Sequence, residues 1–122
     1  MLRIVEVRNT EEFRSLREEW NTLLAQSTAN TIFLSWEWLY SWWEVFGREG
    51  TLSILLAATP EGELRGAAPL MRSTRGLGPL RVQSLEFMGS HSVSSEYLDF
   101  ICLKGCEEEV IESFLDYVLK SP

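Results

Sequence analysis

Histidine and cysteine are scarce in this chain of 122 residues: His91 is the only histidine, and Cys102 and Cys106 are the only cysteines. Two cysteines are too few for a disulfide framework, and without a second pair they do not make a zinc cluster. A metal site at His91 would also lack enough nitrogen or sulfur ligands. We therefore expect no metal centre, and we interpret both cysteines as small, mostly buried residues.

Long apolar runs are absent as well. No uninterrupted run approaches the ~18 to 20 residues that a membrane-spanning helix needs. Arg3, Glu6 and Arg8 interrupt the first residues, where a signal peptide would have an apolar stretch. We therefore expect no membrane insertion and a cytoplasmic location.

Basic residues are outnumbered by acidic ones. Lys and Arg total 11 against 18 Asp and Glu, which gives a net charge of -7. This balance leaves little favourable field for a polyphosphate backbone, so nucleic acid is not an expected partner. It weakly favours a cationic or neutral ligand over an anionic one.

The overall composition is typical of a globular domain. Hydrophobic residues make up 45% and charged residues 24%, so the chain is neither disordered nor fibrous. At ~100 to 200 residues per domain, the length predicts one compact domain. A chain of this size buries roughly two thirds of its unfolded surface and can support its own core.

Apolar spacing and turn residues predict the secondary structure. The expected elements are a strand at 2–7, a helix from Asn9 or Thr10 to Ala25, a helix from Ser35 to before Gly47, strands at Leu52–Ala58 and Leu64–Met71, a strand from Leu80 to Met88, a strand at Tyr97–Leu103 and a helix at Glu107–Leu119. Tight turns between the middle strands, and a last strand that feeds a helix, indicate an α/β fold with a mixed β-sheet flanked by helices. The chain stops just past a helix, so we expect it to be part of a longer protein.

A few residues mark the ends and faces of these elements. Asn9 with Glu12 resembles a capping box, and Ser35 is suited to cap the second helix. Gly47 is suited to a left-handed helix stop, and Pro69 needs a strand edge, a bulge or a strand end because it has no amide hydrogen. Spacing in the last helix turns five residues inward: Val110, Ile111, Phe114, Leu115 and Val118.

The second helix holds four of the five tryptophans: Trp36, Trp38, Trp42 and Trp43. Their angular positions wrap much of the helix, so they cannot all face one core. One interpretation is a stacking or docking surface. The other, which we favour because aromatic residues at helical spacing usually pack, is a core helix whose outward rings are covered by a further domain.

Two segments with glycine are candidates for phosphate binding, and neither has the required context. Gly76-Leu77-Gly78 is followed by Pro79 and a strand-like run, which indicates a hairpin rather than the helix start of a phosphate loop. Gly105 precedes a helix whose first turn carries Glu107, Glu108 and Glu109, and these would repel a pyrophosphate. The sequence therefore predicts no cofactor-binding residue in this chain.

Polar and titratable residues gather around the start of the last strand: His91, Glu96, Tyr97 and Asp99. A catalytic interpretation makes His91 or Glu96 a general base, although no spacing here defines a triad. A surface loop with one titratable histidine is the favoured alternative. By strand alternation Tyr97 and Asp99 share a side and can reach one ligand together, but Asp99 can equally cap or pair with an arginine, which we slightly favour.

Five segments follow one another in a recognisable order and spacing: Glu19–Leu23, Ile32–Trp38, Ser41–Trp43, Gly66–Leu70 and Ser95–Phe100. Together they resemble the N-terminal part of the CelD-like acetyltransferases, a branch of the GNAT superfamily related to the FemAB aminoacyltransferases. The resemblance spans nearly the whole chain, and the expected strand-helix-helix-strand-strand-strand-strand-helix order fits the opening of a GNAT fold. Residues 1–122 would then be a single GNAT-like domain or half-domain of a longer two-half protein.

The resemblance implies an acyl-CoA-dependent N-acyltransferase in which an amine attacks a thioester directly. This chain would be its substrate-side half, inactive alone, with acetyl-CoA or another acyl-CoA held by a second GNAT-like half or a partner subunit. The acceptor would be a small-molecule or glycan amine. On this basis Glu96 is the candidate catalytic residue that contacts the amine, and the candidate substrate-binding residues are Trp38, Trp42, Trp43, Tyr97 and Asp99.

Two other functions stay open. The chain could be a non-enzymatic, tryptophan-rich binding or scaffold module that docks a carbohydrate or a partner protein, because sugar rings stack on flat aromatic faces. Alternatively, it contributes only structure to a parent enzyme, with its tryptophans buried at the interface between the halves.

Overall fold

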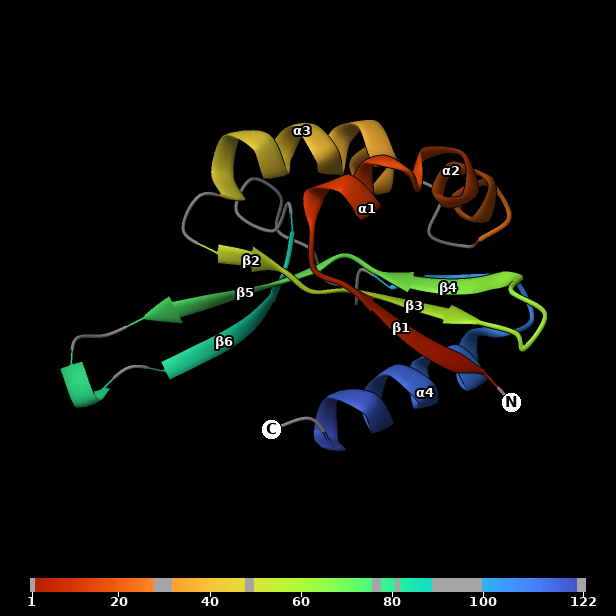
Figure 1. The fold of residues 1–122 in the computed structure, drawn as a ribbon. Helices are drawn as coiled ribbons and strands as arrows, with labels where there is room; N and C mark the ends of the chain where they lie inside the picture. The colour runs from red at the N-terminus through yellow and green to blue at the C-terminus, as the bar shows by residue number, and fades with distance from the viewer. Residues whose placement is uncertain are drawn as a thin grey trace.

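Two antiparallel sheets form the centre of the structure, a computed structural model that describes residues 2–27, 32–47, 50–75, 78–80, 82–88 and 100–120. The first sheet has the order β1 (Arg3–Val7), β3 (Ile54–Ala58), β4 (Leu64–Ala68) and β7 (Ile101–Cys102). The second has the order β2 (Gly50–Leu52), β5 (Leu70–Arg75) and β6 (Val82–Phe87). Three helices lie on one side of the sheets, α1 (Thr10–Arg14), α2 (Arg17–Ala25) and α3 (Trp36–Phe46), and α4 (Glu107–Lys120) lies on the other (Figure 1). The expected α/β class is confirmed.

The expectation of one mixed sheet is wrong for the described strands, because every pair of neighbours is antiparallel. The predicted strands Leu52–Ala58 and Leu64–Met71 do form a hairpin, closed by a turn at Gly62 with φ 94°. A short turn reverses the chain and makes the two strands antiparallel. The two sheets meet along this hairpin near Ser53 and Pro69, and Pro69, which has no amide hydrogen, lies between β4 and β5 with its carbonyl accepting from the Met88 amide at 2.8 Å.

β6 and β7 follow one another along the same line of the sheets, although residues 88–100 separate them in the sequence. Phe87 lies opposite Leu70, and Ile101 lies opposite Ala67. Two residues separate Leu70 from Ala67 on the facing strand, and Met88 and Phe100 are the two residues that lie opposite them. The sides also alternate without a break: Phe87, Phe100 and Cys102 pack in the core beside α4, whereas Met88 and Ile101 pack in the opposite core. Phe100 therefore takes the strand position that follows Met88.

The predicted first helix is divided into α1 and α2. Asn9 caps α1 as expected, because its Oδ1 accepts a hydrogen bond from the Glu12 amide at 2.8 Å. The Glu12 carboxylate accepts in return from the Asn9 side-chain amide, at 2.6 Å. The helix ends at Arg14, where the Leu16 amide donates to the Phe13 carbonyl at 3.1 Å and the Ser15 hydroxyl donates to the Glu12 carbonyl at 2.8 Å.

α3 begins and ends near the predicted residues, but glycine is needed at position 47 for another reason. The Ser35 hydroxyl accepts from the Trp38 amide at 3.3 Å and caps the helix. Gly47 has φ -82°, so the predicted left-handed stop is wrong. A Cβ atom at Gly47 would lie 2.3 Å from the Trp43 ring. The indole occupies the space that any other side chain would need.

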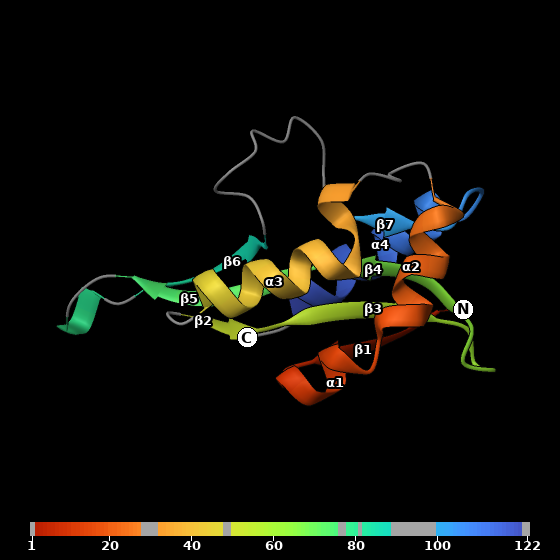
Figure 2. The ribbon, with the colours of Figure 1, turned by 90° about the horizontal axis from the view of Figure 1, so that it is seen from above.

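Each side of the sheets has its own core. On the first side Phe13, Trp20 and Leu39 are fully buried between the helices and the sheets, and seen from above α2 lies over β4 and β7 (Figure 2). On the other side Val110 and Phe114 of α4 pack against the sheets, as predicted. These two contacts position α4 under the first sheet.

The inward orientation predicted for Leu115 is wrong, because its side chain is 48% exposed. Successive residues of a helix differ in direction by ~100°, so a helix that points Phe114 into the core turns Leu115 toward its flank. Leu119, one turn later, is 83% exposed. Ile111 and Val118 are half-buried at the edge of the contact.

Gly66 marks the closest approach between β4 and α4, since a Cβ atom there would lie 2.3 Å from Cγ1 of Val110. We expect Gly66→Ala to lower the free energy of unfolding by about 1–3 kcal/mol through overpacking. Urea denaturation measures the loss. Val110→Ala makes room for the new methyl group, so the double variant should lose less than the sum of the two single losses. Strictly additive losses would show that this contact is not the cause.

Candidate functional site

The structure describes the predicted tryptophans but not the predicted polar segment. Glu96, Tyr97 and Asp99 fall in residues 89–99, outside the described residues, and so does His91. The roles given to these residues stay predictions. Trp38, Trp42 and Trp43 all lie on α3, which runs along one side of the sheets (Figure 2).

The aromatic side chains of α3 face largely inward. Trp42 is 5% exposed and belongs to the core, and Trp38 and Trp43 are half-buried against that core. Little of the Trp42 ring is left for a ligand, so its predicted role in substrate binding gains no support. Trp38 and Trp43 keep part of their surface accessible.

Indole hydrogen bonds tie the helices of this layer together. Nε1 of Trp20 donates to the Leu34 carbonyl at 2.8 Å, and Nε1 of Trp36 donates to the Phe13 carbonyl at 2.8 Å. The Trp36 ring also stacks on Tyr40, with the centroids 4.6 Å apart. A buried indole N–H needs an acceptor, and backbone carbonyls of neighbouring segments provide it here. Packing therefore explains much of this aromatic cluster.

Exposed apolar surface on α3 lies at its C-terminal end. Val45 is 64% exposed and Phe46 is 60% exposed, and the Phe46 ring lies 5.6 Å from that of Trp42. Neither residue was among the predicted site residues, because the sequence drew attention to the tryptophans. This end of α3 presents a small apolar surface that continues into the core.

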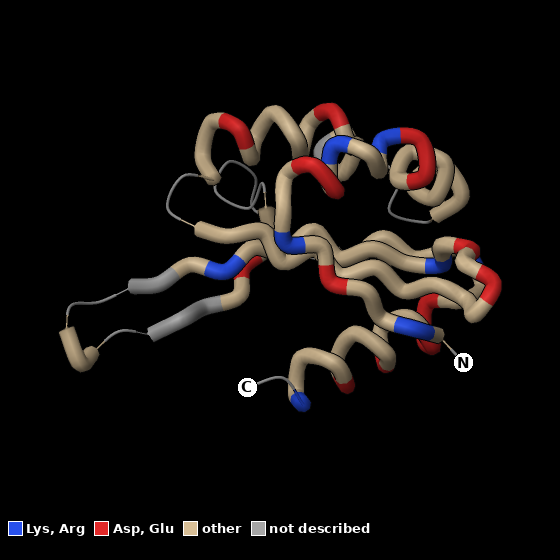
Figure 3. Tube along the Cα trace, in the orientation of Figure 1, with Lys and Arg blue, Asp and Glu red and all other residues tan. Residues whose placement is uncertain are grey.

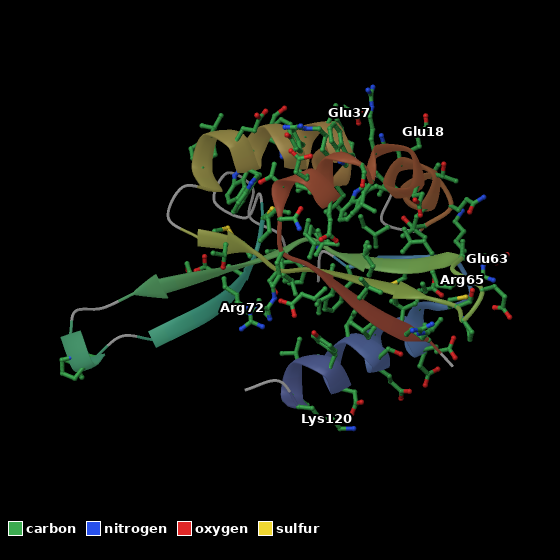
Figure 4. The ribbon with its side chains drawn as sticks, viewed as in Figure 1. Glu18, Glu37, Glu63, Arg65, Arg72 and Lys120 are labelled. Carbon is green, nitrogen blue, oxygen red and sulfur yellow. The ribbon has the colours of Figure 1, made fainter. Side chains whose placement is uncertain are left out.

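A buried carboxylate on the opposite side of the sheet was missed by the sequence prediction. The side chain of Glu6 is 7% exposed and accepts hydrogen bonds from Ser53 Oγ at 2.7 Å, Tyr117 Oη at 2.8 Å and Arg8 Nε at 2.9 Å. Arg72 Nη2 lies 3.8 Å from the same carboxylate, and Figure 4 shows Arg72 below β5 on the side of α4. We call these five residues the Glu6 cluster. It joins β1, β5, α4 and the residue between β2 and β3.

Electrostatics keep the Glu6 cluster in one protonation state. Burial by itself raises the pKa of Glu6, but hydrogen bonds from Arg8, Ser53 and Tyr117 outweigh it and hold the pKa at about 2. The hydrogen bond to Glu6, together with burial, raises the pKa of Tyr117. At neutral pH Glu6 is ionised and Tyr117 carries its proton. The cluster is therefore an anchor between elements rather than a proton-transfer site.

One sequence signal for this cluster existed. Alternation along β1 puts Glu6 on the same side as Leu2 and Ile4, and an acidic residue that faces a core needs partners. Its partners were not predictable, because Ser53 is 47 residues away and Tyr117 is 111 residues away.

A groove runs between β1 and α4 beside the Glu6 cluster. It has a volume of about 560 Å³ and an apolar floor made by Leu2 and Ile4. The wall comes from α4 and is lined by Glu109, Ser113, Asp116, Tyr117 and Lys120. Lys120 pairs with Asp116 at 3.2 Å. Tyr117 thus has one edge on the groove and its hydroxyl on Glu6.

The described residues give little support for a phosphate site, a cysteine nucleophile or a metal site. Gly105 has φ 90°, but its amide donates to the Glu107 carboxylate at 2.8 Å, so that amide is not available to a phosphate. Burial raises the pKa of Cys102 to about 11, which makes its thiol a poor nucleophile. In the described ranges no group of three His, Cys, Asp or Glu residues is placed to hold a metal ion. No described helix has the length and apolar character needed to cross a membrane.

Comparison of the chain with protein-family models, curated proteins and solved structures found no match.

Replacing the buried carboxylate tests the Glu6 cluster. We expect Glu6→Gln to cost on the order of 2 kcal/mol of unfolding free energy at pH 7, after allowance for solvent screening around Arg8. The pKa of Glu6 is lower in the folded chain (about 2) than its ordinary value of 4.5, so this stability is complete above pH 4.5 and is lost as the pH falls toward 2. The stabilities of the two proteins should therefore converge across that range in pH-dependent denaturation.

Glu63→Gln is the matched control. Glu63 pairs with Arg65 at 2.8 Å, but its side chain is 67% exposed (Figure 4). Its replacement should change the unfolding free energy by less than about 0.5 kcal/mol at any pH. Equal losses for the two variants would contradict the role given to the buried carboxylate.

Proposed function

We propose that this chain is the substrate-side, N-terminal half of a GNAT-type acyl-CoA-dependent N-acyltransferase, of the kind that its sequence resembles. The observation that carries the proposal is the order of the elements. The strands β1, β3, β4 and β7 are neighbours in that order, with α1 to α3 inserted after the first strand and α4 after the last. Only the coarse order, a strand, then helices, then strands and a closing helix, is shared with the order that the resemblance implies, and this coarse order is the support for the proposal.

The proposed reaction is amide formation. The amine nitrogen attacks the thioester carbonyl carbon, a C–N bond forms, the C–S bond breaks, and the proton lost by the amine balances the proton taken up by the CoA thiolate. In this proposal the chain supplies the acceptor side, where Glu96 contacts the amine. The substrate wall is assigned to Trp38, Trp43, Tyr97 and Asp99, with Trp42 supporting it from the core.

We assign acetyl-CoA or another acyl-CoA to a second half or a partner subunit. The first turn of α4 holds Glu107, Glu108 and Glu109, which oppose a pyrophosphate at that helix end. Figure 3 shows acidic residues on both helical layers, which suits a cationic or neutral acceptor better than an anionic cofactor.

Two separate exposed apolar patches, on opposite sides of the sheets, are candidate contacts for the second half. Val45 and Phe46 on α3 are each at least 60% exposed, and Leu115 and Leu119 lie together along one flank of α4. Neighbouring exposed apolar side chains of this kind favour contact with another folded unit.

A carbohydrate-binding module is less well supported. Sugar rings need an exposed, flat aromatic face. Trp42 is 5% exposed and Trp36 is already stacked on Tyr40. Titration with neutral oligosaccharides that carry no amine should therefore leave the tryptophan fluorescence unchanged.

Calorimetric titration with acetyl-CoA and with free CoA tests where the cofactor binds. We expect no saturable heat from the 122-residue chain, because the described residues offer no phosphate cradle. Circular dichroism of the same sample shows whether the chain is folded. Saturable binding to the folded chain would overturn the assignment of the cofactor to another part of the protein.

Glu96→Gln tests the acceptor side in the longer protein or complex that contains this chain. Loss of the carboxylate should lower kcat/KM for amine acylation by roughly 100-fold, as expected for a residue that assists proton transfer. Glu63→Gln, on the exposed turn between β3 and β4, should leave transfer unchanged. Full transfer by the Glu96→Gln enzyme would remove Glu96 from the site.

A further inference from the structure

We propose that two copies of this chain associate through the free edge of β1, a property that goes beyond the proposed transferase role. Within the described residues β1 pairs with β3 and with no other strand. An unpaired edge presents a row of N–H and C=O groups that can bind another strand. Val5, at the centre of β1, is 48% exposed, so this edge also carries an apolar residue at its middle.

The groove beside β1 offers the second copy a further surface to contact besides the edge of the strand. Leu2 and Ile4, on the side of β1 that faces α4, line this groove together with residues of α4. Its volume of about 560 Å³ gives room for side chains of the second copy. Edge pairing and groove filling therefore occur on the same side of the molecule.

A two-fold axis at Val5 makes the contact self-complementary. Antiparallel pairing about this residue puts Val5 against Val5 of the second copy, Arg3 opposite Val7, and Arg8 opposite Leu2. No two arginines then face each other, although both ends of the strand are basic.

The charges of α4 fit the same symmetry. β1 and α4 run in roughly the same direction (Figure 1), so antiparallel β1 strands bring the two α4 helices together in opposite directions. Lys120 is at the C-terminal end of α4 (Figure 4), and Glu109 is in its first turn. Lys120 of each copy thus approaches Glu109 of the other, and helix ends of opposite polarity meet.

A second copy fits this edge better than a basic peptide. A basic peptide would find Glu109 and Asp116 in the groove, but it would also meet Lys120 there, and Arg3 and Arg8 at the two ends of β1. A second copy carries both acidic and basic groups, and the two-fold symmetry brings groups of opposite charge together. Because the strand has only 5 residues, the interface is small and the association should depend on concentration.

Light scattering coupled to size-exclusion chromatography tests the proposal with the 122-residue chain. As concentration rises, the mean mass should rise from 14.0 kDa toward twice that value. Val5→Lys places two like charges at the two-fold axis and should return the mass to that of a monomer. Val45→Lys is the matched control, because Val45 is equally an exposed valine but lies on α3.

A charge swap keeps the test valid if Val5→Lys disturbs folding. Glu109→Lys alone and Lys120→Glu alone should each weaken the dimer several-fold, and the double variant should restore it, because the two signs are then exchanged on both copies. High salt should weaken the wild-type dimer for the same reason.

Three results would overturn the proposal: a monomer at every concentration, equal loss of the dimer in Val5→Lys and Val45→Lys, or no rescue in the double variant. Binding of a lysine-rich peptide by a chain that stays monomeric would assign the edge to a basic partner instead, and would also overturn it.

Discussion

Pro69 has no amide hydrogen and lies between β4 and β5, at the point where the two sheets meet. Opposed residues of an antiparallel ladder exchange two bonds, but here only the Met88 amide donates, to the Pro69 carbonyl at 2.8 Å. The strand line is interrupted at this point, after Met88. On the other side of the hairpin the Ser53 amide donates to the Leu70 carbonyl at 3.0 Å, and the Ser53 hydroxyl donates to Glu6. The proline that limits hydrogen bonding at Pro69 thus lies close to Ser53, which binds Glu6 of β1.

The Glu6 cluster explains why α4 is fixed under the first sheet. Val110 and Phe114 supply apolar contact, which has little directional preference. The hydrogen bond that the Tyr117 hydroxyl donates to the carboxylate of Glu6 on β1 is directional, so it fixes the orientation of α4. The opposite layer obtains its direction from indole N–H groups bound to backbone carbonyls. Both helical layers therefore combine nonspecific burial with a few specific hydrogen bonds.

Local signals in the sequence were correct in part: the helix caps at Asn9 and Ser35 were confirmed, whereas the left-handed stop at Gly47 and the inward orientation of Leu115 were wrong. Asn9 and Ser35 act through neighbours within a few residues, so their roles could be predicted. The helix break at Ser15 depends on which of two competing hydrogen bonds forms, and the sequence does not settle that choice. To predict that the strands divide into two sheets, one would need to know the register of several strands at once. The site residues named from the sequence, Glu96, Tyr97 and Asp99, lie outside the described residues, so their roles stay predictions.

The continuity of β6 and β7 has a consequence for how this protein can vary. Met88 and Phe100 hold successive positions in one strand, so the sheet has the same register whatever number of residues joins them. Insertions and deletions between these two positions leave every other pairing in place. Glu96, Tyr97 and Asp99 all belong to that interval. A change in the length or the residues of this segment therefore leaves the register of the scaffold as it is.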